Sequence, residues 1–440
     1  MAAVDRKVQA RSVHRSDMPA SSEPSDVLRF VSTDADIIVP LANGEPPTLL
    51  DVLENHASRL NGVRIHQMHA MQERRYIRGE FGNHLRHVSY FLSPATRDAY
   101  LHCGCELVPS HFSEVPALLH NWTRCSLVMA RASPPDRHGY FSLGTNADYT
   151  ASLIGRVPFY LEVDRGMPRT YGENQLHASQ LAGWCIGDRG LTDVAQARPS
   201  PEDCKIGEFV AERIQDGSTI QIGIGSSTAG VLEALSGHKH LGVHTELLSD
   251  GVMKLVESGV VTGTRKHLRR HKVVATFCLG SRDLYRWLHQ NAAVELLPVD
   301  WVNDPRVIGQ EPQFVSINST TEVDLFGQCA SETVNGRYWS GSGGQADFAR
   351  GAMYSERGKA FVVLRSTTHD GRGRIRSCLS EGSVVTTLKN TVDHVVTEWG
   401  VAELRGRSLA DRARALIGIA HPSTRDQLAK EARQLGLFPC

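Results

Sequence analysis

The sequence predicts an α/β fold built from two similar α/β domains with largely parallel sheets. Apolar, strand-like runs alternate with amphipathic helical segments along most of the 440 residues, which is typical of parallel sheets covered by helices. A strand, a glycine turn and a helix occur in the same order in both halves of the chain. A stretch rich in proline and serine near residue 200 separates the two occurrences.

The first unit is “ADIIVPLANGEPPTLLDVLENH” at residues 35–56, and “VRIHQMHAM” is predicted as the strand that follows it. The second unit is “STIQIGIGSSTAGVLEALSGH” at residues 218–238, followed by the strand in “LGVHTELLSDG”. The units align in outline, with IIVPLANGE beside IQIGIGSST and VRIHQM beside LGVHTE. This alignment indicates an internal duplication of one α/β unit.

The stretch “ARPSPED” at residues 197–203 is the predicted linker. It divides the chain into an N-terminal α/β domain (27–200) and a C-terminal α/β domain (201–440). Residues 1–26 are polar and lack the apolar core of a secretory signal, so we expect a disordered tail there. Two helices are predicted at the C-terminal end, with Ser408 and Ser423 as their N-caps.

Charge and cysteine content narrow the classes of partner. The chain has 48 basic and 48 acidic residues, so neither nucleic acid nor a membrane surface is expected as a partner. No apolar run approaches the ~20 residues of a membrane-spanning helix. The nine cysteines include no CxxC pair, which favours reduced thiols in a cytoplasmic enzyme. His102, Cys103 and Cys105 lack a second pair at ligand spacing, so no metal is expected.

The segment “IGIGSS” contains a turn between a strand and a helix, and we call residues 223–227 the first glycine turn. Such a turn presents backbone N–H groups and a helix N-terminus to an anion or a developing oxyanion. A tight turn without a ligand has the same pattern and stays open as an alternative. Position 228 is Thr, so the third glycine of a dinucleotide fingerprint is missing and a nicotinamide oxidoreductase is not favoured.

A second glycine-rich run, “YWSGSGGQADFARGA”, occupies residues 338–352, and we call residues 341–344 within it the second glycine loop. Gly341, Gly343 and Gly344 would let the backbone approach a ligand closely. A flexible surface loop is the alternative, although the flanking Trp339 and Phe348 are unusual in such a loop.

Glu246 lies at the end of the strand predicted in “GVHTE”, where a loop begins. Because the carboxyl ends of parallel strands meet at one edge of a sheet, Glu246 is expected to face the same crevice as the first glycine turn. A carboxylate beside preorganised N–H donors is an arrangement for nucleophilic catalysis with an oxyanion hole. From position alone, a solvated acid at a strand end remains the alternative.

The chain resembles the acetyl-CoA hydrolase/transferase family, and within it the 4-hydroxybutyrate CoA-transferases. The resemblance runs from about Asp36 to Leu435. Its carriers are “SPPDRHGYFSLG” (133–144), “EVDRGMPRTYG” (162–172), “IQIGIG” (220–225), “GVHTELLSDG” (242–251), “PVDWVNDPRVIGQ” (298–310), “SINSTTEVDLFGQ” (316–328), “SGSGGQADFARGA” (340–352) and “VVTEWGVAELRG” (395–406).

The resemblance implies that Glu246 is the catalytic glutamate, in a cleft between the two domains. Its carboxylate, expected to be ionised near neutral pH, would attack the thioester of a short-chain acyl-CoA and carry coenzyme A as a glutamyl-CoA thioester. The enzyme would work by a ping-pong route, use acyl-CoA as a substrate and need no metal. A homodimer is also implied by the family.

Further site residues come with the resemblance. Backbone donors for the oxyanion are expected at Ile224–Gly225 and at Gly343 or Gly344. Gln221 is expected to hydrogen-bond Glu246 and hold its rotamer. The residues expected to contact coenzyme A are Gly223, Ile224, Gly225, Ser226, Ser227, Gly341, Gly343, Gly344 and Lys359.

Two alternative functions stay open. The same covalent intermediate serves an acetyl-CoA hydrolase if water enters the site, and water exclusion depends on pocket shape. A non-catalytic CoA-binding protein is the alternative from another class, but the presence of Glu246 and of both glycine segments speaks against it. The acceptor acid is left undetermined, because “QERRYIRGEFGNHLRHVSYF” in the N-terminal half matches the family only loosely.

Overall fold

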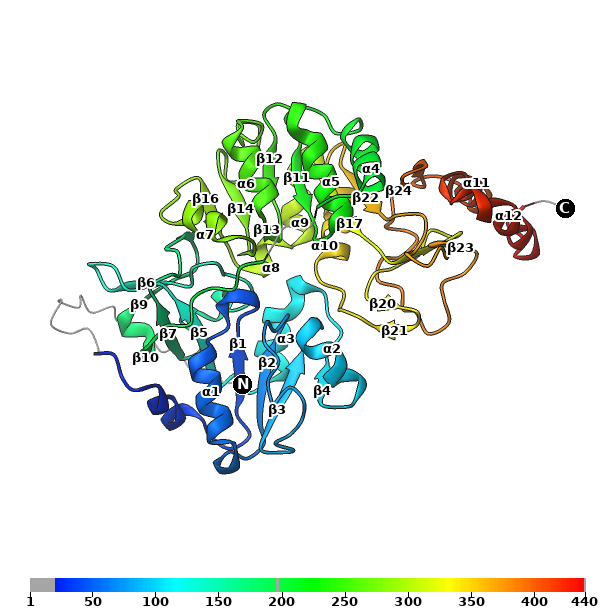
Figure 1. Cartoon of the computed structure of the whole chain (residues 1–440). Helices are drawn as coiled ribbons and strands as arrows, with labels where there is room; N and C mark the ends of the chain where they lie inside the picture. Colours follow the sequence, from blue (N-terminus) through cyan, green and yellow to red (C-terminus); the bar gives the residue numbers. More distant parts are fainter. Residues whose placement is uncertain (1–19, 195–197, 439–440) are drawn as a thin grey trace, which may run out of the picture.

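A computed structural model describes residues 20–194 and 198–438, and Figure 1 shows how they are arranged. Residues 1–19 of the predicted tail and the first residue of the predicted linker lie outside the described residues. The end of the predicted tail is held by the N-terminal sheet. The Ser22 N–H donates to the carbonyl of Trp184 at 2.9 Å, and its hydroxyl lies 2.6 Å from that of Tyr160. The folded part of the chain therefore begins before residue 27.

The N-terminal sheet has seven parallel strands in the order β10-β7-β5-β1-β2-β3-β4. Strands buried on both faces need nearly continuous apolar runs, as in the DIIV of β1. The strands are β1 (Asp36–Val39), β2 (Val63–Gln67), β3 (Leu85–Ser89), β4 (Cys105–Leu107), β5 (Leu127–Ala132), β7 (Phe159–Asp164) and β10 (Leu181–Gly187).

The C-terminal sheet has nine strands in the order β25-β24-β22-β17-β11-β12-β14-β16-β8, and only the β24–β25 pair is antiparallel. Its strands are β8 (Tyr171–Gly172), β11 (Thr219–Ile222), β12 (Gly242–His244), β14 (Val273–Ala275), β16 (Val294–Leu296), β17 (Phe314–Ser319), β22 (Lys359–Val363), β24 (His394–Thr397) and β25 (Gly400–Glu403). The predicted fold class, α/β with largely parallel sheets, is confirmed.

The two sheets share one topology. The N-terminal sheet has the order β10-β7-β5-β1-β2-β3-β4. Without its edge strands β25 and β8, the C-terminal sheet has the order β24-β22-β17-β11-β12-β14-β16. In both sheets the first strand in chain order is central, and the next three strands follow it on one side. This agreement supports the duplication that the sequence alignment indicates.

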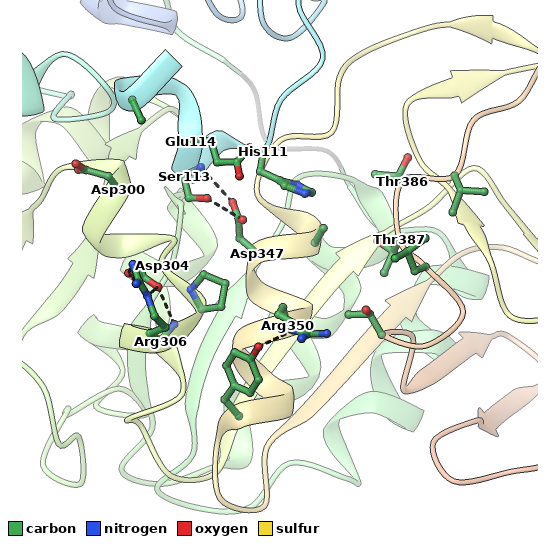
Figure 2. Close-up of a pocket in the computed structure, with 17 residues that line it drawn as sticks. His111, Ser113, Glu114, Asp300, Asp304, Arg306, Asp347, Arg350, Thr386 and Thr387 are labelled. Atoms are coloured by element: carbon green, nitrogen blue, oxygen red, sulfur yellow. Dashed lines mark hydrogen bonds and ion pairs between the residues drawn. The ribbon is translucent and has the colours of Figure 1, made fainter. Parts of the chain in front are cut away.

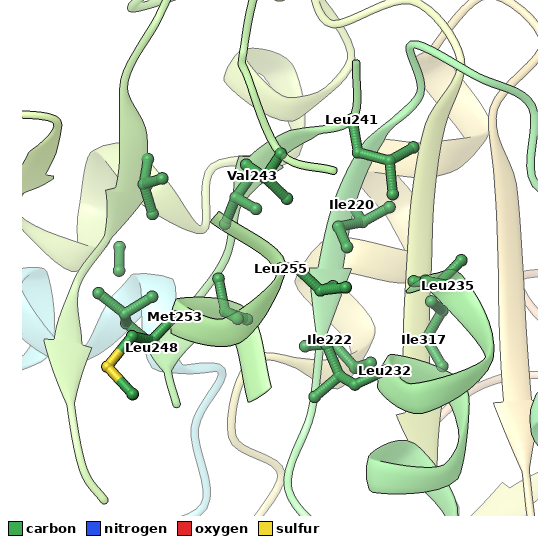
Figure 3. Close-up of a cluster of buried hydrophobic side chains, with 14 of the residues drawn as sticks. Ile220, Ile222, Leu232, Leu235, Leu241, Val243, Leu248, Met253, Leu255 and Ile317 are labelled. Carbon is green, nitrogen blue, oxygen red and sulfur yellow. The ribbon is translucent and has the colours of Figure 1, made fainter. Parts of the chain in front are cut away.

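Helices cover both faces of the C-terminal sheet. Apolar side chains of α4 to α7 pack on one face, where Figure 3 shows Ile220 and Ile222 of β11 beside Leu232 and Leu255. Side chains of α8 to α10, Phe348 among them, pack on the other face. These helices are α4 (Pro201–Ala211), α5 (Ser226–Ala234), α6 (Asp250–Glu257), α7 (Arg282–Leu288), α8 (Val299–Val302), α9 (Pro305–Ile308) and α10 (Gln345–Tyr354).

Shorter elements complete the two halves. In the N-terminal half the helices are α1 (Pro47–Asn55), α2 (Pro94–Leu101) and α3 (Val115–Trp122), and a hairpin pairs β6 (Tyr140–Ser142) with β9 (Gln175–His177). In the C-terminal half the short pairs are β13 (Leu247–Leu248) with β15 (Phe277–Cys278), β18 (Glu322–Asp324) with β19 (Cys329–Ala330) and β23 (Ile375–Arg376), and β20 (Thr333–Val334) with β21 (Arg337–Tyr338).

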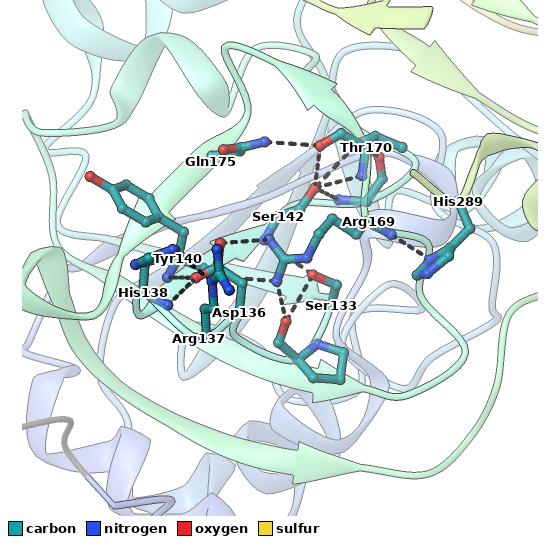
Figure 4. A network of polar contacts seen from close by, with 12 residues as sticks. Ser133, Asp136, Arg137, His138, Tyr140, Ser142, Arg169, Thr170, Gln175 and His289 are labelled. Atoms are coloured by element: carbon teal, nitrogen blue, oxygen red, sulfur yellow. Dashed lines mark hydrogen bonds and ion pairs between the residues drawn. The ribbon is translucent and has the colours of Figure 1, made fainter. Parts of the chain in front are cut away.

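The two halves share an apolar core and polar contacts. One buried cluster joins Val115 and Phe141 of the N-terminal half to Leu247 and Phe277 of the C-terminal half. The loop before β8 also reaches α7, where the Arg169 N–H donates to His289 Nδ1 at 3.2 Å (Figure 4). The strand β8 precedes the proposed domain boundary at residue 200 but pairs with β16 in the C-terminal sheet. We keep that boundary as a proposal, because β10 ends at Gly187 and α4 begins at Pro201.

Two helices, α11 (Leu409–Ile419) and α12 (Arg425–Gln434), end the chain as predicted. Ser408 is the N-cap of α11, since its hydroxyl accepts the N–H of Asp411 at 3.2 Å. The prediction for Ser423 is wrong: this residue lies in a short 3₁₀ turn, and Thr424 is the residue that precedes α12. The turn uses the Ser423 N–H for a bond to His421, so the helix starts one residue later.

Candidate active site

Glu246 lies just beyond the end of β12, beside the first glycine turn at the end of β11. The hydroxyl of Thr245 lies 3.3 Å from the backbone nitrogen of Ile222, which fixes the two strand ends side by side. The carbonyl of Glu246 accepts the N–H groups of Thr276 and Phe277. Backbone hydrogen bonds on both sides thus hold the position from which the carboxyl group projects.

The Glu246 carboxyl group is held by Asn303 and Gly344. The Asn303 side-chain amide donates to Oε2 at 2.8 Å, and the Gly344 N–H also hydrogen-bonds the carboxyl group. A Cβ on Gly344 would lie 2.0 Å from Oε2, so only glycine allows the second glycine loop to approach so closely. The structure therefore brings Glu246 and Gly344 together, as the sequence analysis expected.

Asn303 is a site residue that the sequence analysis missed. It is fully buried at the C-terminal end of α8 and lies within the stretch “PVDWVNDPRVIGQ” that carries part of the family resemblance. An uncharged polar side chain in the middle of such a stretch is a signal for a positioning role. Nothing in the spacing alone connects it to Glu246, 57 residues earlier in the chain.

The environment of Glu246 disfavours its charged form. Burial raises the pKa of this carboxyl group to about 7, the Asn303 hydrogen bond lowers it, and the negative charge of Asp347 raises it further. The expectation that this carboxyl group is ionised near neutral pH rested on the pKa of a free glutamate. The raised pKa moves its titration up to the neutral range.

The first glycine turn lines a narrow pocket of about 180 Å³ next to the strand that follows Glu246. Gly225 has a φ of 137°, a conformation that glycine adopts without strain, and it precedes the first residue of α5. Gly223 approaches Asn318 so closely that a Cβ would lie 2.8 Å from the side-chain oxygen. Ile224 is 57% exposed, so an apolar side chain stands open at the mouth of this pocket.

The two serines of the turn have protein partners. The Ser227 hydroxyl donates to the buried Asp203 at 2.7 Å, and the Ser226 hydroxyl accepts from Arg365 at 3.3 Å. Arg365 in turn makes an ion pair with Asp203. The side chain of Ser227 therefore points toward α4, and only the backbone of this residue remains for contact with a ligand.

The second glycine loop is wedged between the two halves. A Cβ on Gly341 would lie 2.7 Å from the carbonyl oxygen of Tyr90, and the carbonyl of Gly343 accepts the Phe112 N–H at 3.0 Å. Gly343 also has a positive φ of 56°. Gly341 and Gly343 thus serve a close approach between the halves, whereas Gly344 contacts Glu246 and Asn303 within the C-terminal half.

Two predicted residues are not brought to Glu246. The side-chain amide of Gln221 is occupied by Asn318 and by the hydroxyl of Ser316, so the expected bond to Glu246 does not form. Lys359 opens β22, and its ammonium group donates to the carbonyl of Arg213 at 2.8 Å. That contact lies toward the amino end of the sheet, whereas the first glycine turn lies at the carboxyl end.

A cavity of about 770 Å³ opens between the halves beside the first turn of α10 (Figure 2). Asp347, in the first turn of α10, lies on its wall together with His111 and Glu114 of the N-terminal half. Asp300 and Asp304 lie on the opposite side. Its wall includes Asp304 and Ala346, which are close in sequence to Asn303 and Gly344, the two partners of Glu246.

Within residues 20–194 and 198–438, no group of three or more His, Cys, Asp or Glu side chains is placed to hold a metal ion. In the same part of the chain, no helix is both long and apolar enough to span a bilayer. Cys103 and Cys105 are free thiols, the first exposed and the second buried.

Two domains of one known protein family match the chain. The acetyl-CoA hydrolase/transferase N-terminal domain matches residues 1–186, and the C-terminal domain of the same family matches residues 280–432. Glu246 falls between these two ranges. Full-length relatives cover it within one alignment, as described next.

The chain is 38% identical to the succinyl-CoA:cyclohexane-1-carboxylate CoA transferase of Geobacter metallireducens over 414 residues, which cover 94% of each chain. It is 39% identical to the 4-hydroxybutyrate coenzyme A transferase of Clostridium kluyveri, over 90% of this chain and 94% of that one. The acetyl-CoA hydrolase of Saccharomyces cerevisiae is 33% identical over 46% of this chain and 38% of its own.

Solved structures agree with these relatives. The crystal structure of RipA from Yersinia pestis superposes with a TM-score of 0.89 at 32% identity, covering 95% of this chain and 98% of that one. The 4-hydroxybutyrate CoA-transferase of Porphyromonas gingivalis superposes with a TM-score of 0.81 at 32% identity, covering 94% and 97%. The chain therefore belongs to the acetyl-CoA hydrolase/transferase family.

Proposed function

We propose that the chain is a CoA-transferase that moves coenzyme A from a short-chain acyl-CoA to a carboxylic acid through a glutamyl-CoA thioester on Glu246. One observation carries the proposal: the carboxyl group of Glu246 projects from the strand end next to the first glycine turn and is held by Asn303 and Gly344. A carboxylate held beside backbone donors is suited to attack on a thioester carbonyl.

The proposed reaction has two symmetrical halves. The Glu246 carboxylate attacks the thioester carbon, the C–S bond breaks, and a mixed anhydride forms as coenzyme A leaves as thiolate. The thiolate then attacks the glutamyl carbonyl, which forms the glutamyl-CoA thioester and releases the donor acid as its carboxylate. An acceptor carboxylate attacks this thioester, and the same steps in reverse give the new acyl-CoA and free Glu246.

Each attack passes through a tetrahedral oxyanion. We assign the backbone N–H groups of Ile224, Gly225 and Gly343 as donors to it, because the Gly344 N–H already bonds to the Glu246 carboxyl group. One such donor contributes roughly 3–4 kcal/mol. The backbone of the first glycine turn would border the thiol arm of coenzyme A, next to the exposed Ile224. Lys359 is not included, because its ammonium group bonds to Arg213.

The partly buried position of Glu246 suits it to nucleophilic attack. Burial raises the pKa of its carboxyl group to about 7, so the ionised form is more nucleophilic than that of a free glutamate. The reaction should therefore accelerate as pH rises through this value. The relatives named as transferases cover nearly the whole chain, which favours transfer to an acid over hydrolysis as the outcome.

Mass spectrometry tests the proposal. The protein is incubated with acetyl-CoA or succinyl-CoA at pH 8, treated with borohydride and digested. The peptide that contains Glu246 should show the mass of a reduced glutamyl thioester, and Glu246→Gln should show neither this change nor transfer. An unmodified wild-type peptide under turnover would contradict the covalent route.

An acceptor screen separates transferase from hydrolase. The same protein is given one acyl-CoA with acetate, propionate, butyrate, succinate, 4-hydroxybutyrate or cyclohexane-1-carboxylate, and the CoA products are read by mass. New acyl-CoA species support transfer, whereas free coenzyme A at the same rate with and without acids supports the hydrolase.

The proposal includes a homodimer, on the family resemblance, and a cytoplasmic location, on the absence of disulfides among the eight described cysteines. Light scattering on the purified protein tests the first of these.

A further inference from the structure

A hydrogen-bonded clasp joins the two halves at the start of α10. The side-chain hydroxyl of Ser113 donates to Asp347 Oδ1 at 2.9 Å, and the Ser113 N–H donates to Oδ2 at 3.2 Å (Figure 2). The neighbouring Phe112 N–H donates to the carbonyl of Gly343. Two successive residues of the N-terminal half therefore hydrogen-bond to the second glycine loop and to the helix that follows it.

The clasp acts on the residue next to Glu246. Gly344, which touches the Glu246 carboxyl group, lies three residues before Asp347 and directly after Gly343. Asp347 is only 4% exposed, and its charge acts on Glu246. The contacts of Phe112 and Ser113 therefore also determine the positions of the Gly344 N–H and the Asp347 charge relative to Glu246.

We propose that Asp347 is a positioning residue that, held by Ser113, fixes the second glycine loop and keeps a negative charge on the segment that contacts Glu246. The proposal rests on the proposed role of Glu246. Two like charges that interact resist ionising together, so Asp347 keeps part of the Glu246 population protonated, and therefore unreactive, until the pH rises.

The charged groups around this pair come from several elements. His111 and Glu114 flank Ser113 and act on Asp347 with opposite signs, and burial raises the pKa of Asp347. Arg350, one turn further along α10, bonds to the Tyr354 hydroxyl at 2.8 Å. On the side of Glu246, Asn303 is the neutral donor. Hence Asp347 is the negative charge that opposes ionisation of Glu246.

The pH dependence of kcat/KM tests the proposal. In the wild type, the acid limb should have its midpoint near the Glu246 pKa of about 7. Asp347→Asn removes the repelling charge and keeps a group that can bond to Ser113. The midpoint should fall by roughly half a unit to one unit. An acid limb that stays in place would overturn the proposal.

The chain offers a matched control in Asp300. The Ser152 hydroxyl of the N-terminal half donates to Asp300 at 2.7 Å, so the same pair of residue types also bridges the halves on the wall of the same cavity. Asp300 is not among the charges that act on Glu246. Asp300→Asn should leave the acid limb unchanged, and an equal shift in both variants would contradict a specific role for Asp347.

The thermal unfolding temperature measures the repulsion between Glu246 and Asp347 without any need for turnover. The pKa of Glu246 is higher in the folded protein than in the unfolded chain. Its contribution to the free energy of unfolding is therefore fully present below the pKa of the unfolded chain and is lost as the pH rises through about 7. At pH 8, Glu246→Gln should therefore raise Tm more in the wild type than in Asp347→Asn, and at pH 5 the difference should vanish. Equal gains at pH 8 would sink the proposal, whereas a missing thioester on Glu246 would instead sink the proposed function.

Discussion

The N-terminal and C-terminal halves arrange their strands in the same order. They differ at the end of the second strand in chain order, which is β2 in the first half and β12 in the second. The sheet register sets Ile65 opposite Ile37 in the first half and Val243 opposite Ile220 in the second. Three residues further along, the first half has Met68 and the second has Glu246. Equivalent positions of one topology thus carry an apolar core residue in one half and the proposed nucleophile in the other.

The N-terminal half buries a carboxyl group near this edge too, but a positive charge lies beside it. Glu45 accepts the side-chain amide of Gln67 at 2.7 Å and the Met71 N–H at 3.1 Å, and Arg74 lies close enough to favour its charge. Glu246 has Asn303, Gly344 and an opposing Asp347. The two carboxyl groups therefore differ in the sign of the charge beside them: Arg74 favours ionisation of Glu45, whereas Asp347 opposes ionisation of Glu246.

The largest effect should come from closing the space beside Glu246. In Gly344→Ala, the new Cβ would collide with Oε2 and with the Asn303 amide, 2.0 and 2.3 Å away. Displacing the nucleophile should lower kcat on the order of 10²-fold. Gly418→Ala in α11 is the control, since nothing lies within 4 Å of its Cβ, and it should keep full activity. Equal activity of the two variants would contradict the assigned contact.

A smaller change should follow loss of the Asn303 amide. In Asn303→Ala, the bond that lowers the pKa of Glu246 is gone, so this pKa rises above about 7. The acid limb of kcat/KM should then move to higher pH, opposite to the shift expected for Asp347→Asn, and kcat/KM at pH 7 should fall roughly tenfold. Measuring both pH profiles side by side checks the sign. A shift in the same direction in both variants would show that packing, not charge, is responsible.

The smallest effect on turnover should come from Glu45→Gln. Glu45 is bonded within its own half, so kcat should stay at the wild-type value. Burial raises the pKa of Glu45, so its contribution to stability is lost as pH rises through that pKa. The variant should therefore lose less Tm than the wild type between pH 5 and pH 8. A loss of turnover would mean that the N-terminal carboxyl group takes part in the reaction.

Local sequence patterns determined the strand–turn–helix units, the duplication and the position of Glu246. Apolar runs, glycines and caps act over a few residues, and the alternation of strands and helices predicts a parallel sheet whose carboxyl edge carries the site. The family resemblance added the chemistry. The cap at Ser408 followed from the same short-range logic, although the neighbouring prediction at Ser423 missed by one residue.

The tertiary structure alone decided which side chains meet Glu246. Asn303 and Gly344 contact it through the packing of α8 and α10 against the sheet. Asp347 acts on it by charge and is bonded by Ser113 from the other half of the chain. The raised pKa of Glu246 and the diversion of Gln221 to Asn318 have the same origin. Burial and long-range contacts are sums over neighbours far apart in sequence, so no local pattern encodes them.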